Sequence, residues 1–154
     1  MLIFDQQPAI RAHDLNGTFA GLMDLYERNY IQLRLLIPRL PAAGESLVSR
    51  APGSLDVHLT VVERFRYTAE LNLTYFFRKE DEPKAEPDVR IRIYHDARLA
   101  EVMAAHLRHW PVFANEEQVG LATRWRVNRF LFKWLSYCLH QGHRFGTRDR
   151  RAGR

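Results

Sequence analysis

Three stretches between residues 55 and 95 alternate apolar and polar side chains one by one. The apolar members are Leu55, Val57, Leu59 and Val61 in the first stretch, Ala69, Leu71, Leu73, Tyr75 and Phe77 in the second, and Val89, Ile91 and Ile93 in the third. Successive side chains of a β-strand point to opposite faces, so this pattern predicts three half-buried strands. Their connections predict an antiparallel meander with one apolar and one solvated face. The charged, proline-containing stretch 79–87 predicts a loop that interrupts the pairing.

Helical periodicity flanks the alternating region on both sides. Residues 15–37 place apolar side chains at helical spacing, and Pro38 and Pro41 end this segment. Residues 115–139 carry the strongest apolar stripe of the chain, and Gly142 is a typical C-terminal stop.

Residues 97–108 are ambiguous. Their apolar residues recur at helical spacing and Asp96 is a good N-cap, which predicts a helix, although a fourth strand would be the natural continuation of the meander. We therefore predict an α+β domain with an N-terminal helix, an antiparallel meander of three or four strands, and a long C-terminal helix packed on the sheet.

The length of 154 residues and the 46% hydrophobic content fit a single globular domain with a real core. We expect an irregular segment at 1–14, one domain over 15–143 and an arginine-rich tail at 144–154. A lone cysteine, Cys138, allows no internal disulfide. No apolar run is long enough for a membrane span and no signal peptide is apparent, so we expect a cytoplasmic protein without a membrane partner.

The basic character of the chain is concentrated in the tail. The net charge is +5, and the last eleven residues contain five arginines against one aspartate, which leaves the rest of the chain nearly neutral. Such a tail can bind nucleic acid weakly and without sequence specificity through Arg144, Arg148, Arg150 and Arg151. The interpretation as a solubilising terminus is favoured over this one.

Three segments of the chain resemble a known family. ERNYIQLRLLIPRL (27–40), VRIRIYHDARLAEVM (89–103) and NRFLFKWLSYCLHQG (128–142) are similar to the YqiB-like proteins of proteobacteria, a small family of unknown function. The resemblance covers roughly residues 20–142 and implies a cytosolic, single-domain protein. It brings no activity, cofactor or catalytic residue with it.

Two residues are weak candidates for catalysis. His95 ends the third alternating stretch on its apolar side, and Glu63 continues the apolar row of the first stretch unless it already lies in the turn. With tight turns Glu63 would lie opposite Tyr67 and His95 opposite Leu71, about 13 Å apart along the strand. Only a slipped register across 79–87 would bring the two side chains together.

Arginines and one tyrosine populate the solvated face of the predicted sheet. Arg90, Arg92, Arg66 and Tyr94 could form a platform that stacks a base and holds phosphates. Glu70 shares this face, so a surface of ion pairs with little net effect is the favoured alternative.

Both helices carry more apolar or unusual residues than one packed face requires. In the first, Asn29 lies within the apolar stripe, where it either satisfies buried backbone groups or points into a ligand pocket. Ile31 and Leu35 form a second row there, and Trp125, Phe132, Leu135 and Leu139 form one in the last helix. These rows indicate either self-association or contact with a protein partner through the helices, or cover by the rest of the chain.

No metal-binding or catalytic motif is present. The pairs His106/His109 and His140/His143 lack further ligands with zinc spacing, and no cofactor is predicted. The favoured hypothesis is a non-enzymatic binding or interaction module that engages a protein partner or an anionic ligand, nucleic acid included. The alternative is a small hydrolase or nucleotide-handling enzyme that uses Glu63 and His95 with arginines as anion clamps.

Overall fold

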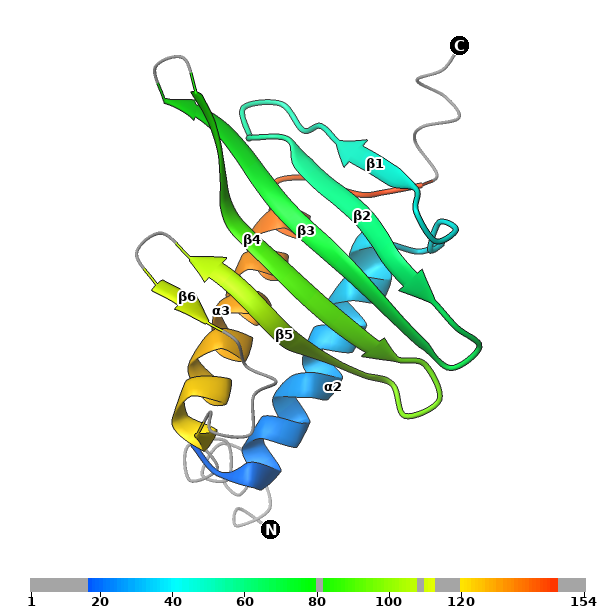
Figure 1. Ribbon diagram of the computed structural model, residues 1–154, viewed down its shortest axis with the longest axis vertical. Helices are drawn as coiled ribbons and strands as arrows, with labels where there is room; N and C mark the ends of the chain where they lie inside the picture. Colours follow the sequence, from blue (N-terminus) through cyan, green and yellow to red (C-terminus); the bar gives the residue numbers. More distant parts are fainter. Residues whose placement is uncertain (1–16, 80–81, 108–109, 113–119, 147–154) are drawn as a thin grey trace, which may run out of the picture.

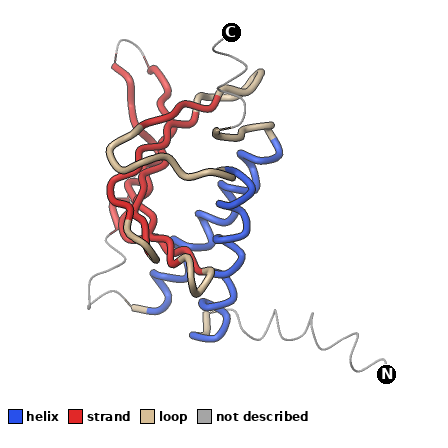
Figure 2. Tube along the Cα trace, turned by 90° about the vertical axis from the view of Figure 1, so that its right-hand side faces the viewer, coloured by secondary structure: helices blue, strands red, loops and turns tan. Residues whose placement is uncertain are grey.

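The computed structural model describes residues 17–79, 82–107, 110–112 and 120–146. In this part of the chain, a six-stranded antiparallel sheet forms one layer. Two helices, α2 (Phe19–Leu36) and α3 (Leu121–His140), lie side by side on one face of the sheet and form the second layer (Figures 1 and 2). The predicted α+β class, with both helices on one face of a meander, is confirmed.

Each strand pairs with its neighbour in sequence, in the order β1 to β6. The strands are β1 (Ser46–Ser49), β2 (Val57–Arg64), β3 (Thr68–Lys79), β4 (Glu82–Tyr94), β5 (Leu99–Leu107) and β6 (Trp110–Val112). The three alternating stretches correspond to β2, β3 and β4. The expected count of three or four strands is too low, because β5 and the two short edge strands extend the meander.

The loop predicted over 79–87 is wrong. Strands β3 and β4 remain paired as far as Lys79 and Glu82, so they form one long hairpin. Main-chain hydrogen bonds hold such a hairpin together, and polar side chains do not prevent them. Pro87 lies where the register shifts opposite Tyr75, a position that tolerates a residue without an N–H group.

The helix predicted over 97–108 is also wrong, because residues 99–107 form β5; residue 108 lies outside the described residues. A bulge lies opposite Arg90 and Ile91, which pair with Ala104 and Val102 and leave Met103 as the extra residue. Val102 and Met103 are therefore both buried, and the break in alternation imitates helical spacing. Asp96 caps no helix; it lies in the β4–β5 turn, where its carboxylate accepts a hydrogen bond from the N–H of Ala97 at 3.0 Å.

The core lies between the sheet and the two helices. It includes Leu33, Leu36, Val57, Leu59, Leu71, Leu73, Val89, Ile91, Val102, Val127, Leu131 and Leu135. The helix predicted over 15–37 is confirmed over α2, which begins after the N-cap Thr18, whose hydroxyl accepts from the N–H of Gly21. The helix predicted over 115–139 is confirmed from Leu121 onward, and 115–119 lie outside the described residues.

One asparagine, Asn128, joins α3 to the β5 bulge. The side-chain oxygen of Asn128 accepts a hydrogen bond from the main-chain N–H of Val102 at 2.9 Å, and its amide donates to the carbonyl of Arg124 at 2.8 Å. Asn128 is fully buried. Because the bulge disturbs the ladder, this side chain satisfies a backbone donor inside the core.

Residues 141–146 cross back from α3 toward the first strands, and we call them the C-terminal strap. Phe145 is buried, and its N–H donates to the carbonyl of Leu36 at 2.8 Å. The buried ring of His143 lies between two hydroxyls, with Nδ1 2.9 Å from Ser49 Oγ and Nε2 3.0 Å from Ser54 Oγ. The strap is therefore held by one apolar and one polar anchor.

We expect Asn128→Ala to lower the free energy of unfolding by about 2 kcal/mol, because it leaves the N–H of Val102 buried without a partner. Chemical denaturation measures the change. Asn72→Ala on the solvated face is the control, and we expect it to cost less than about 0.5 kcal/mol. Equal effects of the two substitutions would show that the link from α3 to the bulge does not stabilise the fold.

We expect the strap to make the stability of the protein pH-dependent. Burial lowers the pKa of His143, although the backbone of Leu55 and Ser49 and the charge of Asp56 oppose this shift. A histidine with a lowered pKa contributes its full stability above its unfolded pKa of about 6.5, and this contribution is lost as the pH falls below that value.

Chemical denaturation across this pH range measures how the free energy of unfolding changes with pH. This pH dependence should weaken in His143→Gln. His140→Gln changes an exposed histidine on the neighbouring turn and should leave it unchanged. If His143→Gln keeps the full pH dependence of the native protein, the assignment to His143 is wrong.

Candidate functional site

The predicted platform on the open face of the sheet is neutralised from within. The carboxylate of Glu70 lies 3.6 Å from Nε of Arg90 and 3.4 Å from a terminal nitrogen of Arg92. The hydroxyl of Tyr94 donates to the carboxylate of Glu101 at 2.6 Å. The structure thus brings Arg90, Arg92 and Tyr94 onto one face, but it also places an acidic partner beside each.

Glu63 and His95 lie on opposite faces of the sheet. A bulge between Val61 and Glu63 shifts the register, so Glu63 pairs with Glu70 rather than with Tyr67 and leaves the apolar row. His95 donates its main-chain N–H to the carbonyl of Tyr67, and Leu71 pairs with Ile91 instead. Both expected registers are wrong, and no shared site forms, since paired residues of neighbouring strands point to the same face.

Three further candidates fall in different places. Arg66 lies in the β2–β3 turn, with its guanidinium carbon 5.2 Å from the centre of the Tyr67 ring. Asn29 is fully buried between the helices and donates to the main-chain carbonyl of Asn128 at 3.4 Å. In the tail, Arg144 belongs to the strap, and its main-chain N–H donates to Ser49 Oγ. Arg148, Arg150 and Arg151 lie outside the described residues.

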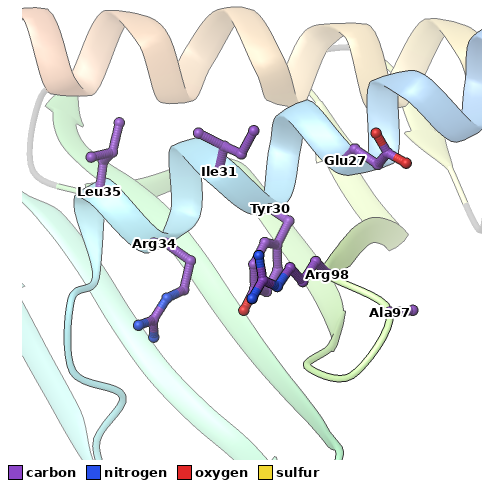
Figure 3. Close-up of a pocket in the computed structure, with 7 residues that line it drawn as sticks. All are labelled: Glu27, Tyr30, Ile31, Arg34, Leu35, Ala97 and Arg98. Atoms are coloured by element: carbon purple, nitrogen blue, oxygen red, sulfur yellow. The ribbon is translucent and has the colours of Figure 1, made fainter.

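A basic hollow opens between α2 and the β4–β5 turn. It has a volume of about 630 Å³ and is lined by Glu27, Tyr30, Ile31, Arg34, Leu35, Ala97 and Arg98. Figure 3 shows Tyr30 and Arg34 pointing to one side of α2 and Ile31 and Leu35 to the other. Residues 27, 30, 31, 34 and 35 occupy a continuous arc of a helix with 3.6 residues per turn. One surface therefore combines a cationic part with an aliphatic part.

The two arginines of the basic hollow differ from those on the open face of the sheet. Within the described residues, neither Arg34 nor Arg98 forms an ion pair, whereas Arg90 and Arg92 share Glu70. Arg98 has a φ of 57°, the left-handed region that costs a side chain with a Cβ roughly 1–2 kcal/mol. The β4–β5 turn holds this arginine in a strained conformation at the rim of the hollow, and strained residues cluster at binding sites.

A small inner cavity lies next to the hollow and shares Tyr30 and Arg34 with it. Its volume is about 10 Å³, and the other lining residues are Leu33, Ile37, Leu40, Ile93 and His95. Burial lowers the pKa of His95, and the nearby charges of Arg34 and Arg64 lower it further, while Asp96 raises it. Arg64 is fixed here because its guanidinium donates to the carbonyls of Leu40 and Pro41. This end of the interlayer space is electropositive.

The second apolar rows of the two helices differ in their exposure to solvent. On α3, Leu135 is in the core, and Trp125, Phe132 and Leu139 pack against buried residues of the same chain. On α2, Ile31 and Leu35 remain 58% and 53% exposed. The chain itself thus covers the row on α3, whereas the row on α2 belongs to the open hollow.

Sequence reasoning missed both arginines of the hollow. The exposed pair Ile31 and Leu35 was the available signal, but Arg98 comes near α2 only because residues 95–98 form a turn rather than the start of a helix. Among the described residues, no cluster of histidine, cysteine and acidic side chains could hold a metal ion.

The comparisons with known proteins agree with the resemblance seen in the sequence. Residues 32–144 match the family model described as a protein of unknown function, DUF1249. The chain is 33% identical over 132 residues to the uncharacterized protein YqiB of Escherichia coli K12, which covers 80% of this chain and 90% of the relative. The YqiB proteins of the strains O6:H1 and O157:H7 match equally well.

No solved structure gave a significant match. Neither helix of the described part of the chain is long and apolar enough to cross a membrane. The match over most of the chain and the identity to YqiB show that this chain belongs to the DUF1249 family of YqiB-like proteins.

Proposed function

We propose that this protein is a binding module that takes up an anionic ligand with an apolar part in the basic hollow. The anionic group, a carboxylate or a phosphate ester, would be held by Arg34 and Arg98 beside Tyr30, and the apolar part would cover Ile31 and Leu35. The observation that carries the proposal is a pair of guanidiniums without acidic partners, in the described residues, at the edge of an open hollow.

The hollow offers a ligand both positive charge and exposed apolar surface. Guanidinium groups form their strongest hydrogen bonds with carboxylates and phosphates. In the part of the chain that the structure describes, those of Arg34 and Arg98 form no ion pair. A ligand that removes the exposed surface of Ile31 and Leu35 from water is stabilised by the hydrophobic effect. Concave sites with a few convergent polar groups and apolar walls are typical of small-molecule binding.

The enzymatic alternative has less support. Glu63 and His95 point to opposite faces, and the arginines nearest to Glu63 across the strands are those that Glu70 already holds. A protein partner with an acidic and apolar segment, or a nucleic acid, would use the same cationic chemistry, and the experiment below separates these occupants from a small amphiphile.

The test is a calorimetric titration with octyl sulfate, kept below its critical micelle concentration, and with inorganic sulfate as the comparison. We expect octyl sulfate to bind more tightly, because its chain covers the aliphatic part of the hollow. Arg34→Gln and Arg98→Gly should each weaken binding by about tenfold or more, the value of one charge-assisted hydrogen bond. Arg129→Gln removes an exposed arginine of α3 as the matched control and should leave the affinity unchanged.

Arg98→Gly also separates binding from folding. Glycine adopts a positive φ without strain, so this variant should unfold at the same or a higher denaturant concentration while it loses affinity. The proposal is wrong if Arg129→Gln weakens binding as much as Arg98→Gly does. Binding of an acidic peptide or an oligonucleotide, but not of octyl sulfate, would overturn the small-ligand assignment in favour of that occupant.

A further inference from the structure

The ring of His95 lies in the inner cavity, next to the basic hollow. It lines the inner cavity together with Tyr30 and Arg34, the two residues that also line the hollow. The backbone is fixed, because the main-chain N–H of His95 donates to the carbonyl of Tyr67 at 2.7 Å. Within the described residues the ring itself makes no hydrogen bond and no ion pair, so its protonation state is decided first by its burial and then by the charges around it.

Those surroundings come from three elements. Arg34 approaches from α2 and Arg64 from the end of β2, and both positive charges oppose protonation of the ring. Asp96 on the β4–β5 turn acts in the opposite sense but more weakly. Tyr30 contributes a phenol ring from α2. In the free protein the imidazole is therefore neutral at pH 7, since its pKa lies below the ordinary value of about 6.5.

We infer that binding of an anion in the basic hollow is coupled to uptake of one proton by the ring of His95. Burial and the charges of Arg34 and Arg64 together keep the ring neutral. An anion on Arg34 cancels part of this positive charge, and the imidazolium then gains an attraction to the same anion. Coupling of this kind is reciprocal, so protonation of His95 must strengthen anion binding by the same factor. The proton comes from the solvent and stays on a ring nitrogen, and no covalent bond to the ligand changes.

This inference rests on the proposed function, because it needs an anion in the hollow. It adds a regulation to that site: the protein would hold its ligand more tightly as the pH falls through the range in which His95 titrates. Histidine is suited to this role because small changes in its surroundings move its charge across the range from about pH 5 to 8.

Inorganic sulfate is the probe of choice, because its own charge does not change in this pH range. Calorimetry at about pH 5.5 and about pH 7.5 should show tighter sulfate binding at the lower pH, by about fivefold or more. His95→Gln should keep sulfate binding but lose most of this pH dependence. His106→Gln removes an exposed histidine of β5 and is the matched control. It should keep the pH dependence of sulfate binding, and it thereby controls for the general rise in positive charge at low pH.

Histidine resonances in NMR spectra provide a readout that does not depend on affinity. Saturating sulfate should raise the pKa of His95. Arg34→Gln should raise the pKa of His95 without any ligand, because it removes one of the two opposing charges.

The outcomes separate the inference from the proposed function. If sulfate binds through Arg34 and Arg98 with the same affinity at both pH values, the coupling to His95 is wrong while the binding function stands. If sulfate and octyl sulfate fail to bind at either pH, the proposed function is wrong and the coupling falls with it. An unchanged His95 pKa in Arg34→Gln would contradict the electrostatic basis of the inference directly.

Discussion

One-sided burial of the sheet is the constraint from which the rest of this structure follows. Both helices cover the same face of the sheet (Figure 2). The apolar residues of β2 to β5 therefore point toward the helices, and the polar residues point to water. On the open face, Arg90 and Arg92 share the carboxylate of Glu70 as their ion-pair partner. At the end of the interlayer space, α2 meets the β4–β5 turn, and there Arg34 and Arg98 form no ion pair with any residue that the structure describes.

The α+β fold could be predicted from the sequence because alternation and helical spacing report burial on one face directly. Two of the failures arise where a β-bulge interrupts the regular ladder. The bulge before Glu63 moves this carboxylate to the open face, and the bulge at Met103 turns two neighbouring residues inward and imitates a helix. The long β3–β4 hairpin was missed because its outer part is charged and contains prolines, while its pairing depends on main-chain hydrogen bonds alone.

The candidate site could not be predicted for a related reason. Arg34 and Arg98 are far apart in the sequence and belong to no motif, and only the turn at 95–98 brings them to one hollow. The residues that the sequence did single out already have acidic partners on the open face. Arg90 and Arg92 share the carboxylate of Glu70, and Tyr94 donates to that of Glu101. A pattern can show which residues are charged and exposed, but only the three-dimensional arrangement shows which charges lack a partner.

The central claim is that the basic hollow, and not the open face of the sheet or the C-terminal arginines, receives an anion. Backbone amide shifts of the isotope-labelled full chain during an octyl sulfate titration test this claim most directly. We predict that the shifted amides cluster in residues 27–35 of α2 and in the 95–98 turn. Shifts concentrated in residues 88–94 of the open face, or in residues 144–154, would contradict it.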